Sequence, residues 1–468
     1  MDFDLSGITD ITQDSREAGP GSLFAAIKGE KIDGVQFIAQ AEAMGAVAVL
    51  CAADAELPPT KMRVIRAENP RLALAQIAAQ FMPAQPEQLV AITGTDGKTS
   101  TADFFRQLAH LCGQASASIG TLGVIGGNDE TWLEATHTTP GAISLHGILS
   151  DMAQSGITHV AMEASSHGLA QYRMHGARLQ AAAFTNFARD HLDFHHTEAE
   201  YFAAKMKLFS EILPAGGIAV INADDKRAAD VRAIAAVRGH EVVDFGMKAE
   251  DMKILSLAPL PHGQEMRCRL FGREHALAIP LVGSFQAMNI LAAIGLALPT
   301  GLALDSLLAA VPTLAGVPGR LQLAATTAKG AGVYVDYAHT PAALVNILAT
   351  LRPHTKGKLH LVFGCGGNRD AGKRPEMGKI ASELADAVIV TDDNPRSEDP
   401  AAIRKAILAA CPRALEIADR SEAIITAISA LGAGDILVIA GKGHEKMQVI
   451  GGVEHPHDDV AVARAAVK

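Results

Sequence analysis

The sequence has few features of a disulfide-bonded, secreted or nucleic-acid-binding protein. Its five cysteines are an odd number and form no Cys-x-x-Cys pair. Neither a disulfide framework nor a zinc ribbon is therefore expected, and a reducing, cytoplasmic compartment fits. The N-terminus shows no basic segment followed by an apolar run, so no secretory signal is expected. The net charge of −10 argues against a nucleic-acid partner, because binding to a phosphate backbone needs clustered Lys and Arg.

Aromatic residues are also scarce, at 4%, whereas hydrophobic residues make up 49% of the chain. This composition suits α/β layers that pack closely through small side chains. One long uncharged stretch, residues 276–304, could be interpreted as a transmembrane helix. It is interrupted by Pro280, Gly283, Gln286, Asn289, Pro299 and Gly301. A buried strand followed by a core helix is therefore expected instead, without membrane insertion.

The order of strand and helix patterns predicts three α/β domains. At roughly 100–200 residues per domain, 468 residues correspond to two to four domains. We place them at residues 1–87, 88–317 and 318–468. The expected strands are Ala46–Leu50 in the first domain, Leu89–Thr93, Thr158–Met162, Ala181–Thr185 and Gly217–Ile221 in the second, and Gly332–Asp336, Leu359–Phe363, Ala387–Thr391 and Asp435–Ile439 in the third. Alternation with helical patterns predicts a mainly parallel sheet in the second domain and a doubly wound, Rossmann-like sheet in the third.

The segment Thr93–Ser100 has the composition of a phosphate-binding loop. It follows the expected strand Leu89–Thr93 and precedes an expected helix, Thr99–Cys112. Glycines allow backbone N–H groups to approach phosphate oxygens, and a helix N-terminus favours negative charge. Lys98 could reach the terminal phosphates and Thr99 could bind Mg²⁺. Only two residues separate Gly94 from Gly97, fewer than in the usual GxxxxGK[ST] pattern, so a glycine-capped turn that happens to carry a lysine is the alternative.

Three further polar residues follow successive elements of the second domain. Glu163 and His191 come after successive expected strands, and parallel strands place their carboxyl ends at one edge of a sheet. Each alone could be an exposed carboxylate or a core histidine, but their shared location favours a metal–phosphate site. Lys205 lies in the helical pattern Tyr201–Phe209, where a solvated lysine is the simpler interpretation.

Taken together, these motifs resemble the Mur ligases of bacterial cell-wall synthesis, and the resemblance covers nearly the whole chain. It implies a uridine-nucleotide domain, a central P-loop ATPase domain and a C-terminal Rossmann-like domain, with ATP and Mg²⁺ required. It implies that Lys205 is carbamylated (N6-carboxylysine), which turns a cationic amine into an anionic metal ligand. The implied catalytic residues are Lys98, Glu163, His191, Lys205 and Arg320. The implied metal ligands are Thr99, Glu163, His191 and Lys205.

The resemblance also implies two nucleotide-linked sites. The ATP contacts would be Gly94, Thr95, Asp96, Gly97, Lys98, Thr99, Ser100, Asn289, Arg320 and Asp336. Asp96 stands where the family usually has Asn. Within the family, the chain resembles the enzymes that act on UDP-N-acetylmuramoyl-L-alanyl-D-glutamate. The contacts to that substrate would be Ser15, Thr138, Thr139, Ser165, Gln171 and Arg173.

The choice of amino acid depends on the tetrapeptide that begins at Asp393. An Asn-Pro turn after a strand is ordinary, but Asp-Asn-Pro-Arg resembles the family's meso-diaminopimelate signature. The diaminopimelate contacts would be Arg369, Asp393, Asn394, Pro395, Arg396, Gly441 and Glu445. The Arg396 guanidinium could grip the distal carboxylate through two hydrogen bonds. Lysine lacks that carboxylate, and a site built on such a bond can reject the lacking analogue by roughly 10⁴-fold.

The expected activity is therefore an ATP-dependent ligation of diaminopimelate to the D-glutamyl side chain, by a monomer. Three alternatives stay open at this point: a lysine-adding ligase, a related ligase such as a folylpolyglutamate synthase or the enzyme adding the terminal dipeptide, and a non-catalytic nucleotide-binding module. Substrate-dependent ADP release separates them. Lys442 and His444, which flank the expected Gly441 and Glu445 contacts, are left without a role.

Overall fold

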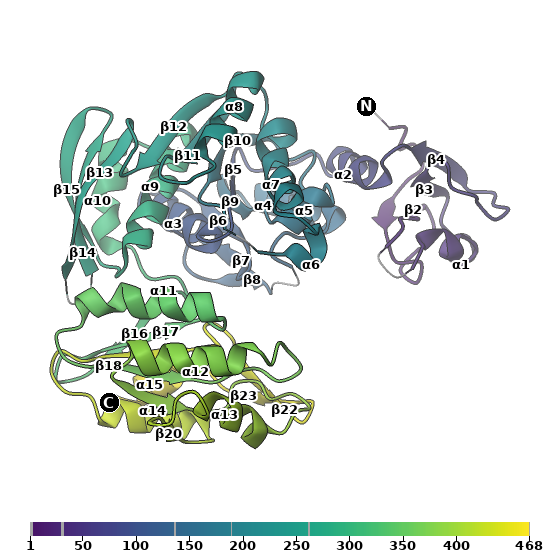
Figure 1. Ribbon diagram of the computed structural model, residues 1–468. Helices are drawn as coiled ribbons and strands as arrows, with labels where there is room; N and C mark the ends of the chain where they lie inside the picture. Colours follow the sequence, from purple (N-terminus) through teal and green to yellow (C-terminus); the bar gives the residue numbers. More distant parts are fainter. Residues whose placement is uncertain (1–2, 30–31, 135–136, 189, 261–262, 468) are drawn as a thin grey trace. The chain divides into compact units, whose positions relative to one another are not determined.

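The computed structural model describes residues 3–29, 32–134, 137–188, 190–260 and 263–467 (Figure 1). These residues pack as two compact units. The first comprises Met1–Lys253 and Asn289–Ala310, and the second comprises Ile254–Met288 and Val311–Lys468. The segment 254–288 thus packs with the C-terminal part of the chain. The domain boundaries at residues 87 and 317 stay predictions.

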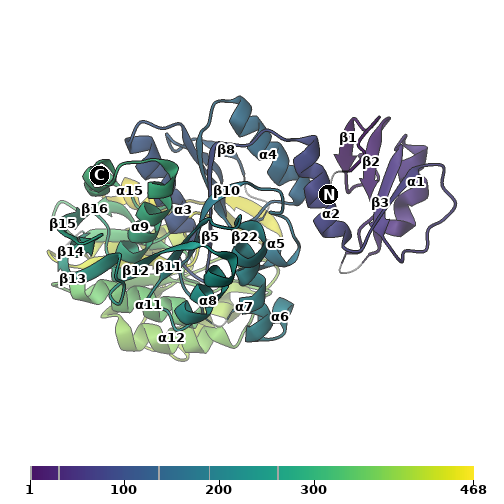
Figure 2. The same ribbon diagram turned by 90° about the horizontal axis from the view of Figure 1, so that it is seen from above.

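The first unit begins with a small parallel sheet. Its strands are β1 (Asp10–Thr12), β2 (Ser22–Ala25), β3 (Ala48–Ala52) and β4 (Arg63–Ala67), paired in that order. Helix α1 (Ile38–Ala43) lies between β2 and β3 in the chain, and helix α2 (Pro70–Phe81) follows β4. Helix α2 begins where Asn69 accepts a hydrogen bond from the N–H of Leu72, with Pro70 as its first residue, a strong start signal. Helix α2 then packs against α4 (Ala142–Gln154; Figure 2).

The central sheet of the first unit carries most of the expected site residues. Its strands pair in the order β12-β11-β10-β5-β9-β6-β7-β8. The strands from β12 to β6 are parallel, and β7 and β8 each pair antiparallel with the strand before them. The strand bounds are β5 (Gln88–Thr93), β6 (Ser116–Gly120), β7 (Gly123–Gly126), β8 (Thr131–Leu133), β9 (His159–Glu163), β10 (Leu179–Phe184), β11 (Ile218–Asn222) and β12 (Glu241–Gly246). The predicted mainly parallel sheet is confirmed.

Helices cover this sheet because its parallel strands are buried on both faces. They are α3 (Lys98–Leu111), α4, α5 (Ser166–Ala170), α6 (Leu192–His195), α7 (Glu198–Lys207), continued by a π-helical turn over Leu208–Ile212, and α8 (Ala228–Arg238). The unit also contains the C-terminal part of α9 (Ser284–Ala297) and α10 (Leu304–Ala310). The carboxyl ends of β5, β9 and β10 lie side by side, since these strands are neighbours in the sheet. That edge is where ligands of open parallel sheets bind.

The second unit contains a doubly wound sheet, as predicted. Its strands pair in the order β16-β17-β21-β18-β19-β20, all parallel except β16. Their bounds are β16 (Gln322–Thr326), β17 (Gly332–Asp336), β18 (Leu359–Phe363), β19 (Ala387–Val390), β20 (Leu415–Glu416) and β21 (Ile436–Ala440). Consecutive residues of a strand enter opposite cores: Leu361 belongs to one hydrophobic cluster and Val362 to another. Both faces are therefore covered.

The helices of this sheet are α11 (Pro341–Leu351), α12 (Lys373–Leu384), α13 (Pro400–Leu408), α14 (Arg420–Ser429) and α15 (Asp459–Ala466). A small hairpin, β22 (Met447–Ile450) and β23 (Val453–Pro456), precedes α15. The unit also includes most of β13 (Met252–Leu260) and the antiparallel pair β14 (Gly263–Leu270) and β15 (Arg273–Ile279).

The uncharged stretch 276–304 is not a membrane helix. Strand β15 ends at Ile279, and the 14-residue helix α9 begins at Ser284, so the predicted strand and core helix are confirmed. Across the described residues, no helix combines the length and the apolar character that a bilayer crossing requires. All five cysteines are free, as the spacing predicted.

Candidate functional site

The phosphate loop is held from outside by the end of the neighbouring strand β10. The side chain of Asn186 accepts a hydrogen bond from the N–H of Asp96 at 2.9 Å and donates one to its carbonyl at 3.1 Å. The hydroxyl of Thr185 also donates to the carbonyl of Asp96, at 2.6 Å. The loop needs glycine at its first position, because Gly94 has φ +148° and a Cβ there would lie 1.9 Å from the Thr185 hydroxyl. The loop is thus preshaped by side chains before any ligand binds.

Helix α3 begins directly after the loop, with Gly97 in the left-handed region at φ 84°. A Cβ on Gly97 would lie 2.5 Å from Oδ1 of Asn289, so the structure brings Asn289, a predicted ATP contact, against the loop. Lys98 folds back and donates to the carbonyls of Gly94 and Thr95, at 3.0 and 2.8 Å. Ser100 is buried in the first turn of the helix. The predicted ATP residues of the first unit therefore gather in one place.

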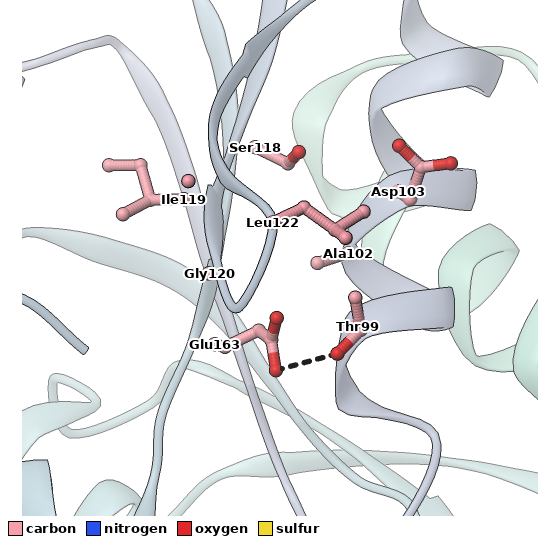
Figure 3. A pocket seen from close by; sticks show the side chains of 9 residues that line it. Thr99, Ala102, Asp103, Ser118, Ile119, Gly120, Leu122 and Glu163 are labelled. Atoms are coloured by element: carbon pink, nitrogen blue, oxygen red, sulfur yellow. Dashed lines mark hydrogen bonds between the residues drawn. The ribbon is translucent and has the colours of Figure 1, made fainter. Parts of the chain in front are cut away.

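Glu163, at the end of β9, faces Thr99 across a small pocket (Figure 3). The Thr99 hydroxyl donates to Oε2 of Glu163 at 3.0 Å, and the N–H of Thr121 donates to Oε1 at 2.7 Å. Glu163 is 2% exposed, and Gly120 leaves room for it, since a Cβ there would lie 2.1 Å from Oε1. A hydroxyl and a carboxylate held together are hard oxygen donors, the kind that Mg²⁺ prefers.

Lys205 is the most unusual charged group of the first unit. It is 1% exposed, and its Nζ lies 4.5 Å from the centre of the Tyr201 ring and donates to the carbonyl of Gly94 at 2.5 Å. Burial lowers the pKa of Lys205 well below its ordinary value, and the nearby ammonium of Lys98 lowers it further. The simpler interpretation of a solvated helix lysine is therefore wrong, because the side chain points inward to the phosphate loop.

His191 lies at the rim of the same region. Its backbone has φ 52°, and its ring lies 5.0 Å from the ring of His167 and 5.8 Å from that of Tyr201. Tyr201 thus contacts both His191 and Lys205. Arg189, two residues earlier, lies outside the described residues. Within the described parts of the chain, no three His, Cys, Asp or Glu side chains form a metal cluster; the predicted ligand set instead uses Thr99 and a modified Lys205.

The predicted muramoyl-dipeptide residues of the central sheet form one hydrogen-bonded group. The hydroxyl of Thr139 donates to the carbonyl of Glu163 at 2.7 Å and lies 2.9 Å from the hydroxyl of Ser165. Arg173 donates to the carbonyl of Thr139 at 2.7 Å and to Gln171. These residues are therefore tied directly to the predicted metal residue.

Two other predicted substrate contacts have separate surroundings. Thr138 lies beside Thr121, with their hydroxyl oxygens 3.2 Å apart. Ser15 is buried in the N-terminal sheet region and donates to Gln40 at 2.9 Å. A cavity of about 230 Å³ is lined by Gln13, Ile27, Arg71, Leu74, His137, Gly141, Ala142, Gln171 and Arg173. Its two guanidinium groups, from Arg71 and Arg173, suit an anionic ligand.

In the second unit, Asp336 organises the turn that carries Arg320. Its two carboxylate oxygens accept hydrogen bonds from the N–H groups of Leu321 and Ala338, each at 2.7 Å. Burial raises the pKa of Asp336, and these two N–H groups oppose that rise. The guanidinium of Arg320 lies 4.9 Å from the centre of the Tyr337 ring. The predicted contacts of Arg320 with phosphate and of Asp336 with ribose stay predictions.

The predicted amino-acid residues converge at the ends of β18, β19 and β21. Arg396 has φ 54° and donates from its guanidinium to the carbonyl of Gly367 at 2.7 Å. Gly366 lies against both Arg396 and Arg369, since a Cβ there would meet side-chain atoms of each. Gly367 approaches Pro395 even more closely, because a Cβ there would lie 1.9 Å from its carbonyl oxygen. The two arginines are therefore presented by one pair of loops.

Two carboxylates and an amide complete this group. Asn394 donates to Oε2 of Glu445 at 2.8 Å. Oδ1 of Asp393 accepts from the N–H of Asn394 at 2.7 Å, while its buried Oδ2 has no hydrogen-bond partner among the described residues. Gly441 is required next to that oxygen, because a Cβ would lie 2.5 Å from it. The arrangement offers both cationic and anionic groups to a zwitterionic ligand.

Sequence reasoning missed several residues of these sites. The two-point contact of Asn186 with Asp96 was not predicted. Thr121, Arg71 and Lys442 carried no local signal. Thr121 contacts Glu163 and Lys442 contacts Asn394, both far away in the sequence, and Arg71 lines a cavity with residues from distant segments.

Comparisons with known proteins agree with this geometry. The profile of the Mur ligase middle domain matches residues 92–297, that of the Mur ligase glutamate ligase domain matches 319–443, and that of the Mur ligase family catalytic domain matches 7–82. UDP-N-acetylmuramoyl-L-alanyl-D-glutamate--2,6-diaminopimelate ligases from Caulobacter vibrioides and Brucella melitensis are each 48% identical to the chain. The alignments cover 98% of this chain and 96% and 94% of those proteins.

Solved structures give the same result. A structure of a UDP-N-acetylmuramoyl-L-alanyl-D-glutamate--2,6-diaminopimelate ligase is 35% identical, with a TM-score of 0.76, covering 98% of this chain and 94% of that one. The MurF ligase from Thermotoga maritima, solved in complex with ADP, shares the fold at 20% identity with a TM-score of 0.61, covering 95% of this chain and 96% of that one.

Proposed function

Because the chain belongs to the Mur ligase family, we propose that it adds meso-diaminopimelate to the D-glutamyl side-chain carboxylate of UDP-N-acetylmuramoyl-L-alanyl-D-glutamate, using ATP. The observation that carries this proposal is the 48% identity, over 98% of the chain, to relatives that bear this activity in their names. At that level of identity and coverage, both the fold and the arrangement of site residues are expected to be shared.

The surroundings of Arg396 support diaminopimelate as the amino acid. Diaminopimelate differs from lysine by a carboxylate at its distal end, and a planar guanidinium can bind a carboxylate through two hydrogen bonds. Arg396 keeps one nitrogen on the carbonyl of Gly367 and has further N–H groups for a ligand. Glu445, within the same group of residues, suits the distal ammonium.

The first unit supplies groups suited to ATP and Mg²⁺. Backbone N–H groups of the loop and the N-terminus of α3 suit the phosphates, and Lys98 supplies a cation at the same place. Thr99 and Glu163 would hold one Mg²⁺, and His191 with a carbamylated Lys205 would hold a second. Bound Mg²⁺ would neutralise charge on the phosphate oxygens during transfer.

The buried amine of Lys205 favours the carbamate. Among the described residues, an unmodified ammonium there donates to one neutral carbonyl and lies near the ammonium of Lys98, and the carboxylates of Asp190 and Asp96 each oppose that repulsion more weakly. A lowered pKa raises the fraction of the amine that is neutral, and a neutral amine can attack CO₂, forming an N–C bond and releasing a proton. The resulting carbamate is an anion beside Lys98. The repulsion between two ammonium groups is then replaced by an attraction between opposite charges.

The reaction then proceeds in two steps. The D-glutamyl carboxylate attacks the γ-phosphorus of ATP, giving ADP and an acyl phosphate. The amine of diaminopimelate attacks the acyl carbon, a tetrahedral intermediate forms, and phosphate leaves as the amide forms and the nitrogen loses a proton. Lys98 and Arg320 would stabilise the negative charge that develops on the phosphoryl oxygens. The hydrogen-bonded residues Thr139, Ser165, Gln171 and Arg173 would position the dipeptide. Thr139 links them to the predicted metal residue Glu163.

Phosphate release by the purified protein tests this proposal. Release should require ATP, the UDP-muramoyl dipeptide and diaminopimelate together, and omission of any one should abolish it. Release with an unrelated acceptor, or none with any muramoyl substrate, would contradict the proposal. A cytoplasmic location and a monomeric state belong to the same proposal, and sedimentation of the purified chain checks the second.

A further inference from the structure

Lys442 is a fully buried lysine that no step of the proposed reaction uses. Its exposed fraction is 0%. Its Nζ donates to three oxygens: Oδ1 of Asn394 at 3.1 Å, Oε2 of Glu445 at 3.1 Å and the carbonyl of Met447 at 2.6 Å. All three hydrogens of the ammonium are therefore used. Two of the three acceptors are side chains of the amino-acid site.

The carboxamide of Asn394 has only one orientation that fits these contacts. Its Oδ1 accepts from both Lys442 and the N–H of Val449, the latter at 3.0 Å. If the amide were reversed, its NH₂ group would face two donors and lose both hydrogen bonds. In the observed orientation, its NH₂ donates to Oε2 of Glu445 at 2.8 Å. Lys442 and the N–H of Val449 thus together determine which group of Asn394 faces Glu445.

The carboxylate of Glu445 is oriented by the same ammonium. Its Oε2 accepts from both Lys442 and Asn394, whereas no described residue donates to Oε1. The side chain of Glu445 is 34% exposed, and that of Lys442 is not exposed at all. One oxygen is therefore fixed inside the protein, and the other stays available to a ligand. A buried cation beside it offsets the cost of holding a partly buried carboxylate.

The backbone around Lys442 explains how a lysine can occupy this position. Gly441 and Gly443, its two neighbours, have φ 120° and 56°, conformations that favour glycine. The N–H of Gly441 donates to the carbonyl of Asp336 at 3.0 Å, which anchors the turn at the end of β17. The turn directs the Lys442 side chain into the protein interior, toward Asn394. Lys446, four residues later, is exposed.

We propose that Lys442 is a positioning residue of the amino-acid site, whose ammonium fixes the Asn394 carboxamide and the Glu445 carboxylate in the orientation that binds the amino-acid substrate. The inference rests on the proposed function, because it needs Asn394 and Glu445 to contact that substrate. It assigns Lys442 no contact with the reacting atoms. Its loss should therefore weaken amino-acid binding much more than turnover.

The test uses Lys442→Met, which keeps the length of the side chain and removes its charge. The KM for diaminopimelate should rise roughly 10- to 100-fold, by analogy with the loss that follows removal of a group that orients a metal ligand. The KM values for ATP and for the UDP-muramoyl dipeptide should stay within roughly twofold, as expected for sites that do not share partners. Lys446→Met, on the same loop but exposed, is the matched control and should leave all three constants unchanged.

A double-mutant cycle with Glu445→Gln separates positioning from a structural role. If Lys442 acts through Glu445, then adding Lys442→Met to Glu445→Gln should raise the KM for diaminopimelate far less than Lys442→Met does alone. Full additivity, or an equal rise of all three KM values, would overturn the proposal. Lys442→Gln keeps a polar group in the buried site and is the second variant if Lys442→Met does not fold; loss of folded protein with both would assign Lys442 to stability alone.

The two proposals fail in different ways. If the wild type works with lysine and not with diaminopimelate, then the proposed amino acid is wrong, but the Lys442 test proceeds with lysine as the varied substrate. If the wild type prefers diaminopimelate and Lys442→Met leaves its KM unchanged, then only the role of Lys442 is wrong.

Discussion

The Nζ of Lys205 and the carbonyl oxygen of Gly94 form a 2.5 Å hydrogen bond between residues 111 positions apart in the sequence. It is the one hydrogen bond that the ammonium makes within the described chain. Helix α7 thereby places the amine of Lys205 beside Gly94, the first glycine of the phosphate loop. This contact links the predicted modification of Lys205 to the predicted ATP site.

Activity should depend on dissolved CO₂ through Lys205. Burial lowers the pKa of the amine well below its ordinary value, so the reactive neutral form persists to lower pH than in a solvated lysine. Bicarbonate should therefore restore the activity of CO₂-depleted protein even near neutral pH. Phosphate release before and after bicarbonate addition measures this effect.

Lys205→Ala should lose activity by about 10²-fold or more and should not respond to bicarbonate. Lys207→Ala, on the same helix, is the control and should keep the bicarbonate response. Full activity of Lys205→Ala would show that the amine is no metal ligand, and a mass spectrum of the native protein without the extra CO₂ would argue the same way.

Glu163→Gln should raise the Mg²⁺ concentration needed for activity. The amide keeps a similar shape and can still accept from the N–H of Thr121, but it removes the negative charge that faces Thr99. We expect half-maximal activity at a Mg²⁺ concentration roughly 10- to 100-fold higher, measured by titrating Mg²⁺ during phosphate release. The exposed Glu130→Gln provides the matched control, and an unchanged Mg²⁺ titration of Glu163→Gln would rule out the role.

Arg396→Lys should reduce the preference for diaminopimelate over lysine. An ammonium keeps the charge but cannot make the paired hydrogen bonds of a guanidinium. The ratio of kcat/KM for the two amino acids should fall by about 10²-fold, from a starting ratio of about 10⁴. Arg413→Lys, at an exposed position, should leave that ratio alone. If the kcat/KM ratio of Arg396→Lys were as large as that of the wild type, residues other than Arg396 would select diaminopimelate over lysine.

The buried pair Arg420–Asp459 should be the main electrostatic support of the second unit. The two side chains are 0% exposed and are joined by two hydrogen bonds of 2.7 Å. Removing Arg420 takes away two of the hydrogen bonds to a buried carboxylate and leaves it the contact with His457, so Arg420→Met should cost about 3–5 kcal/mol. Urea unfolding followed by circular dichroism measures it, and Arg413→Met should change little.

The pH dependence of that support has a definite sign. Burial raises the pKa of Asp459, but the Arg420 guanidinium and His457 lower it more, so it lies well below its ordinary value. The stabilisation is therefore complete above the pKa of an unfolded aspartate and is lost as the pH falls below it. The difference between the wild type and Arg420→Met should be full at pH 7 and should shrink in acid; a difference that grew in acid would contradict the account.

The elements and the motif-bearing residues could be predicted from sequence because their signals are local. Buried strands such as Leu359–Phe363 are continuous apolar runs, and the phosphate loop is marked by glycines between a strand and a helix. Boundaries moved by a residue or two: the strand predicted at Ala46–Leu50 is β3, Ala48–Ala52. Such shifts arise because hydrogen bonds to neighbouring strands decide where a strand begins.

The supporting residues could not be predicted, because their partners depend on the tertiary fold. Thr121 meets Glu163 only because β6 pairs with β9, an order that one sequence does not reveal. No role was predicted for Lys442 from the sequence, and its burial follows from the positive φ of the glycines on either side. The packing of residues 254–288 with the second unit likewise has no local signal.

The most direct test of the central claim is a competition experiment read by mass spectrometry. The purified protein is given ATP, Mg²⁺, UDP-N-acetylmuramoyl-L-alanyl-D-glutamate and equal concentrations of meso-diaminopimelate and lysine. The account predicts a product that carries diaminopimelate in amide linkage to the D-glutamyl side chain, with one ADP per product and almost no lysine adduct. A product that carries mainly lysine, or ADP release without any amide product, would contradict it.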